Sequence, residues 1–529
     1  MKKRDFFPKP GMTVILMIFA TLLSKVLGLF RQMMVAGIFA AEMEGIAFSA
    51  ASKIPLAIFD MLFSTAVIGS FLPIYKSHIQ TEAMRAKRFS SSFFTVIFVV
   101  TAILALLGIL FAPNLIAIAA PDLDEKTAAL AAKLLAIMFP SMIFAGAAYT
   151  LIGILQSHER FLLPAFVSAV SNLVIILYLA FRPISVEEST VVGLAFAYLV
   201  SWVVQFLTLA IPLLFRKQFP TPTVSIRNAD TALAFRRALP VMFGSWLIPM
   251  TTLSVSAFSS FIESNRIAEN TASGAAIVVY ETAFSVFSIA AGLLTYGICN
   301  YIFPKLSEKF SSGNETEFSK LIGKALFASL ALILPIASAL FLLAKEVISF
   351  LYLRGNFTEA LVSATADSLE MLCFAMPFYG LIELFSRVCY SCGKVHFPLI
   401  ASLGGIGVSF LFLSLSLMTG MLSVRTAALG SVLGQVTAAS LLIFFCLRNF
   451  PKIRKEFPFG KFFYLLIGFL VCTASMWGCR VILKHFLHFS HTFQNFITIA
   501  IVFAVGFVVY LIWLFLTKII SFPHIPESK

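Results

Sequence analysis

The chain has 529 residues, of which 60% are hydrophobic and only 12% are charged, and its mean hydropathy is +0.96. About a quarter of the residues of a soluble protein are charged, so the composition excludes an ordinary soluble protein. The formal net charge of +14 would indicate nucleic acid in a soluble chain, but here most of the excess lies between apolar segments, so we expect no nucleic-acid partner.

Apolar segments of about 20 residues recur from one end of the chain to the other, which is typical of a polytopic helical membrane protein. The first segment follows a basic start but is too long for a signal peptide, so we expect a retained first helix. The sequence therefore predicts an all-α fold with fourteen transmembrane spans, over residues 11–40, 46–75, 90–112, 127–155, 161–181, 191–215, 238–262, 274–304, 321–344, 360–390, 397–418, 425–447, 462–480 and 493–517.

The distribution of Lys and Arg predicts the orientation of these spans. If the N-terminus is inside, 25 of the 39 basic residues lie in inside segments and seven lie in outside segments. Cytoplasmic loops of membrane proteins carry an excess of Lys and Arg. We therefore expect both termini in the cytoplasm.

Two landmarks repeat along the chain at nearly the same spacing. Pro73 and Pro304, near the ends of the second and eighth predicted spans, are 231 residues apart, and Pro164 and Pro398 are 234 apart. A duplication of six spans accounts for both offsets, and transporters built from parallel repeats bind substrate between the lobes. The predicted organisation is an N-lobe over 1–215, a cytoplasmic linker over 216–237, a C-lobe over 238–450, and two further spans with the tail over 451–529.

Four ionisable side chains lie inside the first two predicted spans: Lys25, Arg31, Lys53 and Asp60. A charge in hydrocarbon costs several kcal/mol unless it is paired or faces water. Three cations against one anion therefore predict a polar cavity that receives a negatively charged ligand. The alternative is that each cation extends along its apolar stem to the membrane interface.

Further acids lie in later predicted spans. They either pair with the buried cations or carry a coupling ion. Of these, we expect Glu281 to be the best candidate for coupling, because it lies at the start of the second lobe's counterpart of span two. The acids considered for these roles are Asp60, Glu281, Glu370 and Glu383.

The first of several motifs is Ser24-Lys25-Val26-Leu27-Gly28 with Arg31, which resembles the start of the MurJ (MviN) family. This family belongs to the superfamily of multidrug, oligosaccharidyl-lipid and polysaccharide exporters. Lys53-Ile54-Pro55 and Phe71-Leu72-Pro73 match its second span, and residues 351–358 are similar to a signature in an outer loop. The resemblance covers residues 10–450.

The resemblance implies a flippase that moves lipid II, the undecaprenyl-diphosphate-linked peptidoglycan precursor, across the bacterial plasma membrane by alternating access. By similarity, Lys25, Arg31 and Lys53 would line a central cavity and bind the diphosphate. Arg and Lys suit this task because they form charge-assisted hydrogen bonds with phosphate. The implied partners are the lipid-linked precursor, membrane lipids and the cell-wall synthesis machinery.

We expect a transporter and no enzyme, with no cofactor and no metal site. The chain contains no Walker A motif, so an ion gradient or the membrane potential would drive transport. The residues do not select among H⁺, Na⁺ and Cl⁻ as the coupling ion. The CxxC of Cys389 and Cys392 is interpreted as small residues at a helix end, because a metal site would need more ligands nearby.

The chain departs from the family pattern at two cations. The family has Arg early in its second span, where Phe59 and Asp60 stand here. It also has an Asp-Arg pair after a tyrosine in its eighth span, where Tyr280 is followed by Glu281, Thr282 and Ala283. These differences predict altered coupling or another lipid-linked oligosaccharide as substrate.

Two other functions remain open on the sequence. An ion-coupled drug or small-molecule antiporter of the same superfamily would have a cavity dominated by acids, whereas the first lobe here has three buried cations against one acid. The second is a membrane scaffold for cell-wall assembly that transports nothing.

Overall fold

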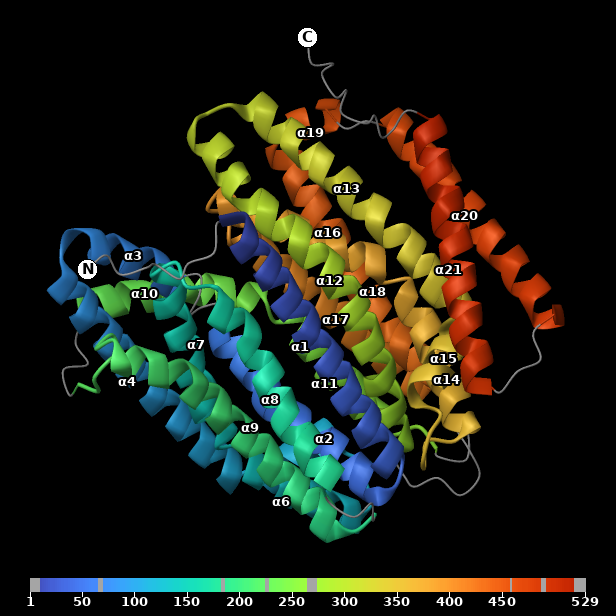
Figure 1. The fold of residues 1–529 in the computed structure, drawn as a ribbon, viewed down its shortest axis with the longest axis horizontal. Helices are drawn as coiled ribbons and strands as arrows, with labels where there is room; N and C mark the ends of the chain where they lie inside the picture. Colours follow the sequence, from blue (N-terminus) through green and yellow to red (C-terminus); the bar gives the residue numbers. More distant parts are fainter. Residues whose placement is uncertain are drawn as a thin grey trace. The chain divides into compact units, whose positions relative to one another are not determined.

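The computed structural model describes residues 10–64, 70–181, 186–223, 228–263, 274–456, 459–486 and 491–517 (Figure 1). All regular secondary structure in these ranges is helical, which confirms the predicted fold class. Internal contacts divide the chain into two compact units: unit 1 contains Met1–Val278 with Arg354–Phe357, and unit 2 contains Val279–Leu353 with Thr358–Lys529. This division by contacts does not test the predicted lobes and linker, which stay a prediction.

The helices of unit 1 are α1 (Pro10–Phe39), α2 (Met43–Phe59), η1 (Asp60–Ser64), α3 (Leu72–Thr81), α4 (Ala83–Leu110), α5 (Ala112–Ala119), α6 (Glu125–Met138), α7 (Ser141–Ser157), α8 (Leu162–Phe181), α9 (Glu188–Phe215), α10 (Ala229–Gly244) and α11 (Leu247–Ser259). The boundary between the units falls within α12 (Ala275–Ser311). Unit 2 continues with α13 (Glu315–Leu342), α14 (Ala344–Tyr352), α15 (Glu359–Cys373), α16 (Met376–Ser391), α17 (His396–Met418), α18 (Val424–Asn449), α19 (Pro451–Glu456), α20 (Phe459–Phe486) and α21 (His491–Leu516).

Each of the fourteen predicted spans has a counterpart among the described helices. Twelve spans are long and apolar enough to cross a membrane, and two more arise if α10 with α11, and α15 with α16, each count as one bent span. The pairs are bent by 47° and 45°. At the second bend, Pro377 lies in the first turn of α16, where its fixed φ suits a helix start and its missing N–H prevents continuation of α15.

The second predicted span, 46–75, is not one continuous α-helix. After α2 the chain forms the π-helical turn η1, and a new helix, α3, begins at Leu72 with Pro73 in its first turn. Such wide turns often occur at functional sites. The carbonyl of Met61 in η1 accepts a hydrogen bond from the indole of Trp246, which lies at the bend between α10 and α11 (2.9 Å). Two irregular points in different helices are thus held together.

Helix α1 packs along α8 through small and polar residues (Figure 1). The Asn172 amide donates to the carbonyl of Ser24 (3.2 Å), and the Ser24 hydroxyl lies 3.3 Å from the carbonyl of Ala165. A Cβ at Gly28 would lie 3.3 Å from the Asn172 nitrogen, so glycine permits the close approach of the two helices. The Ser and Gly of the SKVLG motif therefore have a packing role.

Aromatic side chains dominate the core of unit 1 at the start of α3 and α4. The ring of Phe71 lies 5.2 Å from Phe89 and 4.9 Å from Phe93, measured between centroids, and all three are buried. A Cβ at Gly153 of α7 would come within 2.8 Å of the Phe71 ring, so the glycine leaves room for it. Aromatic pairs at these distances add to the free energy of burial.

A buried ion pair joins α14 and α20 within unit 2. The guanidinium of Arg480 donates two hydrogen bonds to the carboxylate of Glu346 (2.9 and 3.0 Å), and the Lys484 ammonium lies 3.8 Å from the same group. Nearby, Asn495 of α21 donates to the hydroxyl of Ser349 (2.8 Å). The final two helices, which lie side by side in Figure 1, are thus both attached to α14 by polar contacts.

The short segment Arg354–Phe357 contacts the C-terminal end of α1. The Asn356 amide N–H donates to the carbonyl of Gly37 (2.9 Å), and its side chain donates to the carbonyl of Ile38 (2.7 Å). Gly355 adopts φ of +55°, and a Cβ there would lie 2.1 Å from the Gly37 oxygen. Only glycine fits this contact.

We expect Gly355→Ala to displace this segment, because the added methyl group would collide with the Gly37 carbonyl. Amide hydrogen exchange at Asn356 should become about tenfold faster or more, since loss of its hydrogen bond exposes the N–H. Gly313→Ala is the matched control, because Gly313 has φ of +70° but open space around it. Equal exchange at Asn356 in both variants would contradict the proposed contact.

Arg480→Ala should lower the Tm of the detergent-solubilised protein by several degrees. Removing one partner of a buried pair leaves a desolvated carboxylate and costs about 3–5 kcal/mol. Lys133→Ala is the control, because its ion pair with Glu188 is about half exposed and such pairs contribute about 0–1 kcal/mol. A loss of Tm no larger than that of Lys133→Ala would show that Glu346 does not depend on Arg480.

Candidate functional site

Helix α1 carries two of the predicted cations at different degrees of burial. Lys25 follows Ser24, whose hydroxyl and carbonyl contact α8, and its side chain is exposed. It makes no hydrogen bond or ion pair with any residue that the structure describes. Arg31 is half-buried and does have polar interactions. Arg31 is therefore the more buried of the two cations.

Helix α2 carries Lys53 and ends next to Asp60. One face of α2 is buried against α6, α7 and α9, and Lys53 is half-buried beside that face. Asp60 is the first residue of the π-helical turn η1 and is also half-buried. Both side chains have polar interactions. The wide turn therefore places a carboxylate directly after the last α-helical residue, Phe59.

The charges of Arg31 and Asp60 both act on one buried tyrosine. Each interacts electrostatically with the hydroxyl of Tyr198 of α9. Tyr198 is only 8% exposed. Three elements, α1, η1 and α9, thus contribute a cation, an anion and a phenol that interact electrostatically. The sequence predicted the cation and the anion, but contained no signal for the tyrosine between them.

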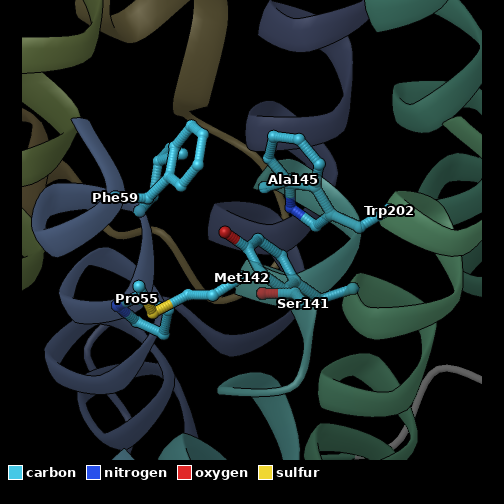
Figure 2. A pocket seen from close by; sticks show the side chains of 8 residues that line it. Pro55, Phe59, Ser141, Met142, Ala145 and Trp202 are labelled. Carbon is cyan, nitrogen blue, oxygen red and sulfur yellow. The ribbon is translucent and has the colours of Figure 1, made fainter. Parts of the chain in front are cut away.

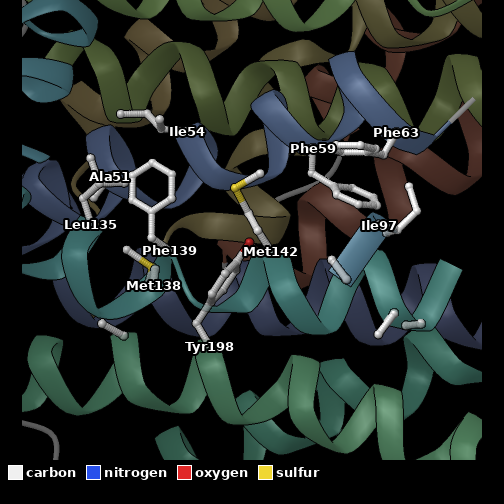
Figure 3. Close-up of a cluster of buried hydrophobic side chains, with 14 of the residues drawn as sticks. Ala51, Ile54, Phe59, Phe63, Ile97, Leu135, Met138, Phe139, Met142 and Tyr198 are labelled. Carbon is white, nitrogen blue, oxygen red and sulfur yellow. The ribbon is translucent and has the colours of Figure 1, made fainter. Parts of the chain in front are cut away.

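A narrow crevice adjoins this group inside unit 1. Figure 2 shows Pro55 and Phe59 of α2 on one side and Trp202 of α9 on the other. Tyr198 and Met142 of α7 also line it, and Figure 3 shows these two side chains next to each other in the hydrophobic cluster of unit 1. The crevice is too narrow for a water molecule. The polar group around Tyr198 therefore borders a dry, tightly packed wall.

The predicted acids of unit 2 have different surroundings. Glu281 is 5% exposed in α12, between buried Tyr280 and Thr282, and has polar interactions. Glu383 of α16 is more exposed and lies 3.5 Å from the guanidinium of Arg387, one turn away. Glu383 therefore has an ion partner on its own helix. Pairing of these acids with Lys25, Arg31 or Lys53, and the coupling role of Glu281, stay predictions.

Other ionic contacts could not be predicted, because they join residues distant in the sequence. Besides Glu346 with Arg480, the buried carboxylate of Asp230 accepts two hydrogen bonds from Arg85 (both 2.9 Å). Arg425, at the start of α18, pairs with Asp367 at 2.7 Å and lies 3.8 Å from Glu370. Hydropathy identifies such residues as charges near span ends, but it does not indicate their partners.

No group of three or more potential metal ligands occurs among the described residues. The Cys389 sulfur lies 3.7 Å from the Cys446 sulfur of α18, and both thiols are free and buried. This agrees with the interpretation of the CxxC as small residues packed at a helix end. The arrangement of the site offers charge and hydrogen bonds for binding an anion.

Solved structures with the same fold were found by comparison. An inward closed structure of lipid II flippase MurJ aligns with a TM-score of 0.73 at 21% sequence identity, covering 96% of this chain and 100% of that chain. An inward-facing multidrug resistance transporter of the MATE family aligns with a TM-score of 0.65 at 14% identity, covering 83% of this chain and 99% of that one. These likenesses confirm the predicted fold.

Proteins of related sequence identify the family to which this chain belongs. A probable lipid II flippase MurJ of Buchnera aphidicola subsp. Schizaphis graminum is 29% identical over 464 residues, with 86% of each chain covered. The lipid II flippase MurJ of Burkholderia cenocepacia is 26% identical over 475 residues, covering 87% of this chain and 88% of that one. A family model described as lipid II flippase MurJ matches residues 35–512. The chain therefore belongs to the lipid II flippase MurJ family.

Proposed function

We propose that this protein translocates lipid II, or a closely related lipid-linked precursor, between the leaflets of the plasma membrane by alternating access. The family match over residues 35–512 is the observation that carries the proposal. The half-buried Arg31 supports it, since a charge inside an apolar helix is costly to retain without a function. No bond is made or broken in such transport, so no catalytic group is required.

The diphosphate would bind to Lys25, Arg31 and Lys53. Guanidinium and ammonium groups replace the water that the phosphate oxygens lose, while the lipid tail stays in the bilayer. Exposed Lys25 would meet the headgroup first, and Arg31 would hold it more deeply. Asp60, which shares Tyr198 with Arg31, would balance the charge of the empty site.

Coupling to an ion would involve the acids. Glu281 is the preferred candidate, because burial makes its charged form sensitive to what surrounds it. Glu383 already has Arg387 at 3.5 Å and would serve as a structural partner. The membrane potential would contribute about 2.3 kcal/mol per charge moved across 100 mV.

The excess of Lys and Arg in alternate loops supports an orientation with both termini in the cytoplasm. In that orientation the precursor would enter from the cytoplasmic leaflet. The product would then be delivered to the cell-wall synthesis machinery on the outer face, which is the partner that this function implies.

Arg31→Ala and Lys53→Ala should each slow lipid II translocation at least about tenfold, because a hydrogen bond to a charged group contributes about 1.5–3 kcal/mol. The measurement is the appearance of lipid II in the outer leaflet of cells that depend on this copy, at matched protein levels. Lys133→Ala, at an exposed surface pair, is the control. Normal translocation in both site variants would exclude these cations from binding.

Glu281→Gln should abolish the response of translocation to an imposed ion gradient, because the neutral amide cannot exchange a proton or bind a cation in the same way. Glu383→Gln should leave that response intact. Proteoliposomes containing lipid II, with a pH, Na⁺ or Cl⁻ gradient applied in turn, provide the measurement. An unchanged gradient response in Glu281→Gln would assign coupling to another group.

A further inference from the structure

Unit 1 contains a second polar cavity, distinct from the group around Tyr198. Its volume is about 260 Å³, enough for several water molecules. It lies where the candidate membrane spans Ala83–Leu110, Glu125–Ser157 and Glu188–Phe215 begin or end, so we expect it near the level of the lipid headgroups. Its polar lining consists of Tyr75, Lys87, Ser90, His158, Lys217 and Gln218.

The lining of this cavity, called here the Lys87–Lys217 cavity, is positively charged. It contains two ammonium groups and no carboxylate. Neither Lys87 nor Lys217 forms an ion pair with any residue that the structure describes. The neighbouring acid, Glu159, is exposed and lies 3.5 Å from the ammonium of Lys76. The cavity therefore has two positive charges that are not balanced by its own walls.

Neutral hydrogen-bonding groups complete the lining. The Ser90 hydroxyl donates to the carbonyl of Lys87 (3.0 Å) and also interacts with the Tyr75 hydroxyl. Arg160 donates to the amide oxygen of Gln218 (3.2 Å), which leaves the Gln218 NH₂ group available as a donor. Burial, and then the charge of Arg160, lower the pKa of His158, so its ring is neutral at pH 7 and can donate one hydrogen bond. An anion with several oxygen acceptors suits this combination.

Helix dipoles account for some of the surrounding cations but not for Lys87. Arg160 and Lys217 follow the C-terminal ends of α7 and α9, where positive charge is favourable. Lys87 lies near the N-terminal end of α4, where the dipole opposes a cation, and no side chain caps that end. Ala83, the first residue of α4, also lines the cavity, so the positive end of the helix adds to the field.

The backbone at Lys217 is also unusual. Lys217 adopts φ of +56° directly after the end of α9, a position where glycine is the common residue. A lysine in this conformation is strained, yet its ammonium contributes half of the charge in the lining. A substitution to glycine would therefore remove the charge while relieving the strain.

We propose that the Lys87–Lys217 cavity binds a phosphate-bearing anion, supplied either by an anionic phospholipid headgroup or by soluble phosphate. This site uses none of the cations assigned to the translocated substrate. Its position at the ends of three spans would place a bound headgroup against α3, α4 and the segment after α9.

The test uses the purified full-length protein and the double variant Lys87→Gln/Lys217→Gln, with Lys133→Gln as the control. Native mass spectrometry after extraction from vesicles of phosphatidylcholine and phosphatidylglycerol measures the retained phosphatidylglycerol. A Tm series with inorganic phosphate against chloride, at constant ionic strength, measures binding of soluble phosphate. In the double variant we expect either the retained phosphatidylglycerol or the phosphate-dependent Tm shift to fall at least tenfold. In the Lys133→Gln control both should be unchanged.

Loss of phosphatidylglycerol retention identifies a lipid headgroup as the ligand, and loss of the phosphate-dependent Tm shift identifies a soluble one. Lys217→Gly is included in case the double variant misfolds. Glycine suits the positive φ of this position, so this variant should fold at least as well as the natural chain and still bind the anion more weakly. Equal retention and equal phosphate response in the natural chain, the double variant and Lys217→Gly would overturn the proposal.

Discussion

The charge of Arg31 within an apolar helix is the constraint on which unit 1 depends. A guanidinium in hydrocarbon is tolerated only where polar groups or water meet it. The structure supplies an aspartate and a buried tyrosine from two other elements. On the same helix, Ser24 and Gly28 allow α1 to approach α8 closely. Packing of small residues and placement of charge are therefore parts of one arrangement.

The same constraint explains why this fold suits a substrate with a charged head and an apolar tail. Cations fixed on helices can replace the hydration of a diphosphate without being bound to any one conformation of the sugar or peptide. Half-buried groups keep part of their own hydration, so the empty site is not prohibitively unstable. The crevice lined by Pro55, Phe59 and Trp202 is too narrow for a water molecule.

Hydropathy was sufficient to predict the fold, because each membrane span consists of one continuous run of mostly apolar residues in the sequence. The positions of Arg31 and Asp60 inside spans were predicted for the same reason. Their shared electrostatic interaction with Tyr198 was not predicted, because it depends on how α1, η1 and α9 pack. The sequence also did not predict the π-helical turn at Asp60, because that turn is set by local backbone winding. It did not predict the ion pair of Glu346 with Arg480, because these residues are 134 positions apart.

The hydrogen bond from Trp246 to Met61 has a mechanical consequence. Met61 belongs to a wide helical turn, and Trp246 lies at the 47° bend between α10 and α11. If the turn tightened into regular α-helix, the Met61 carbonyl would rotate toward its own helix axis and leave the indole N–H without an acceptor. A change of winding at η1 and a change of the bend between α10 and α11 are therefore energetically coupled.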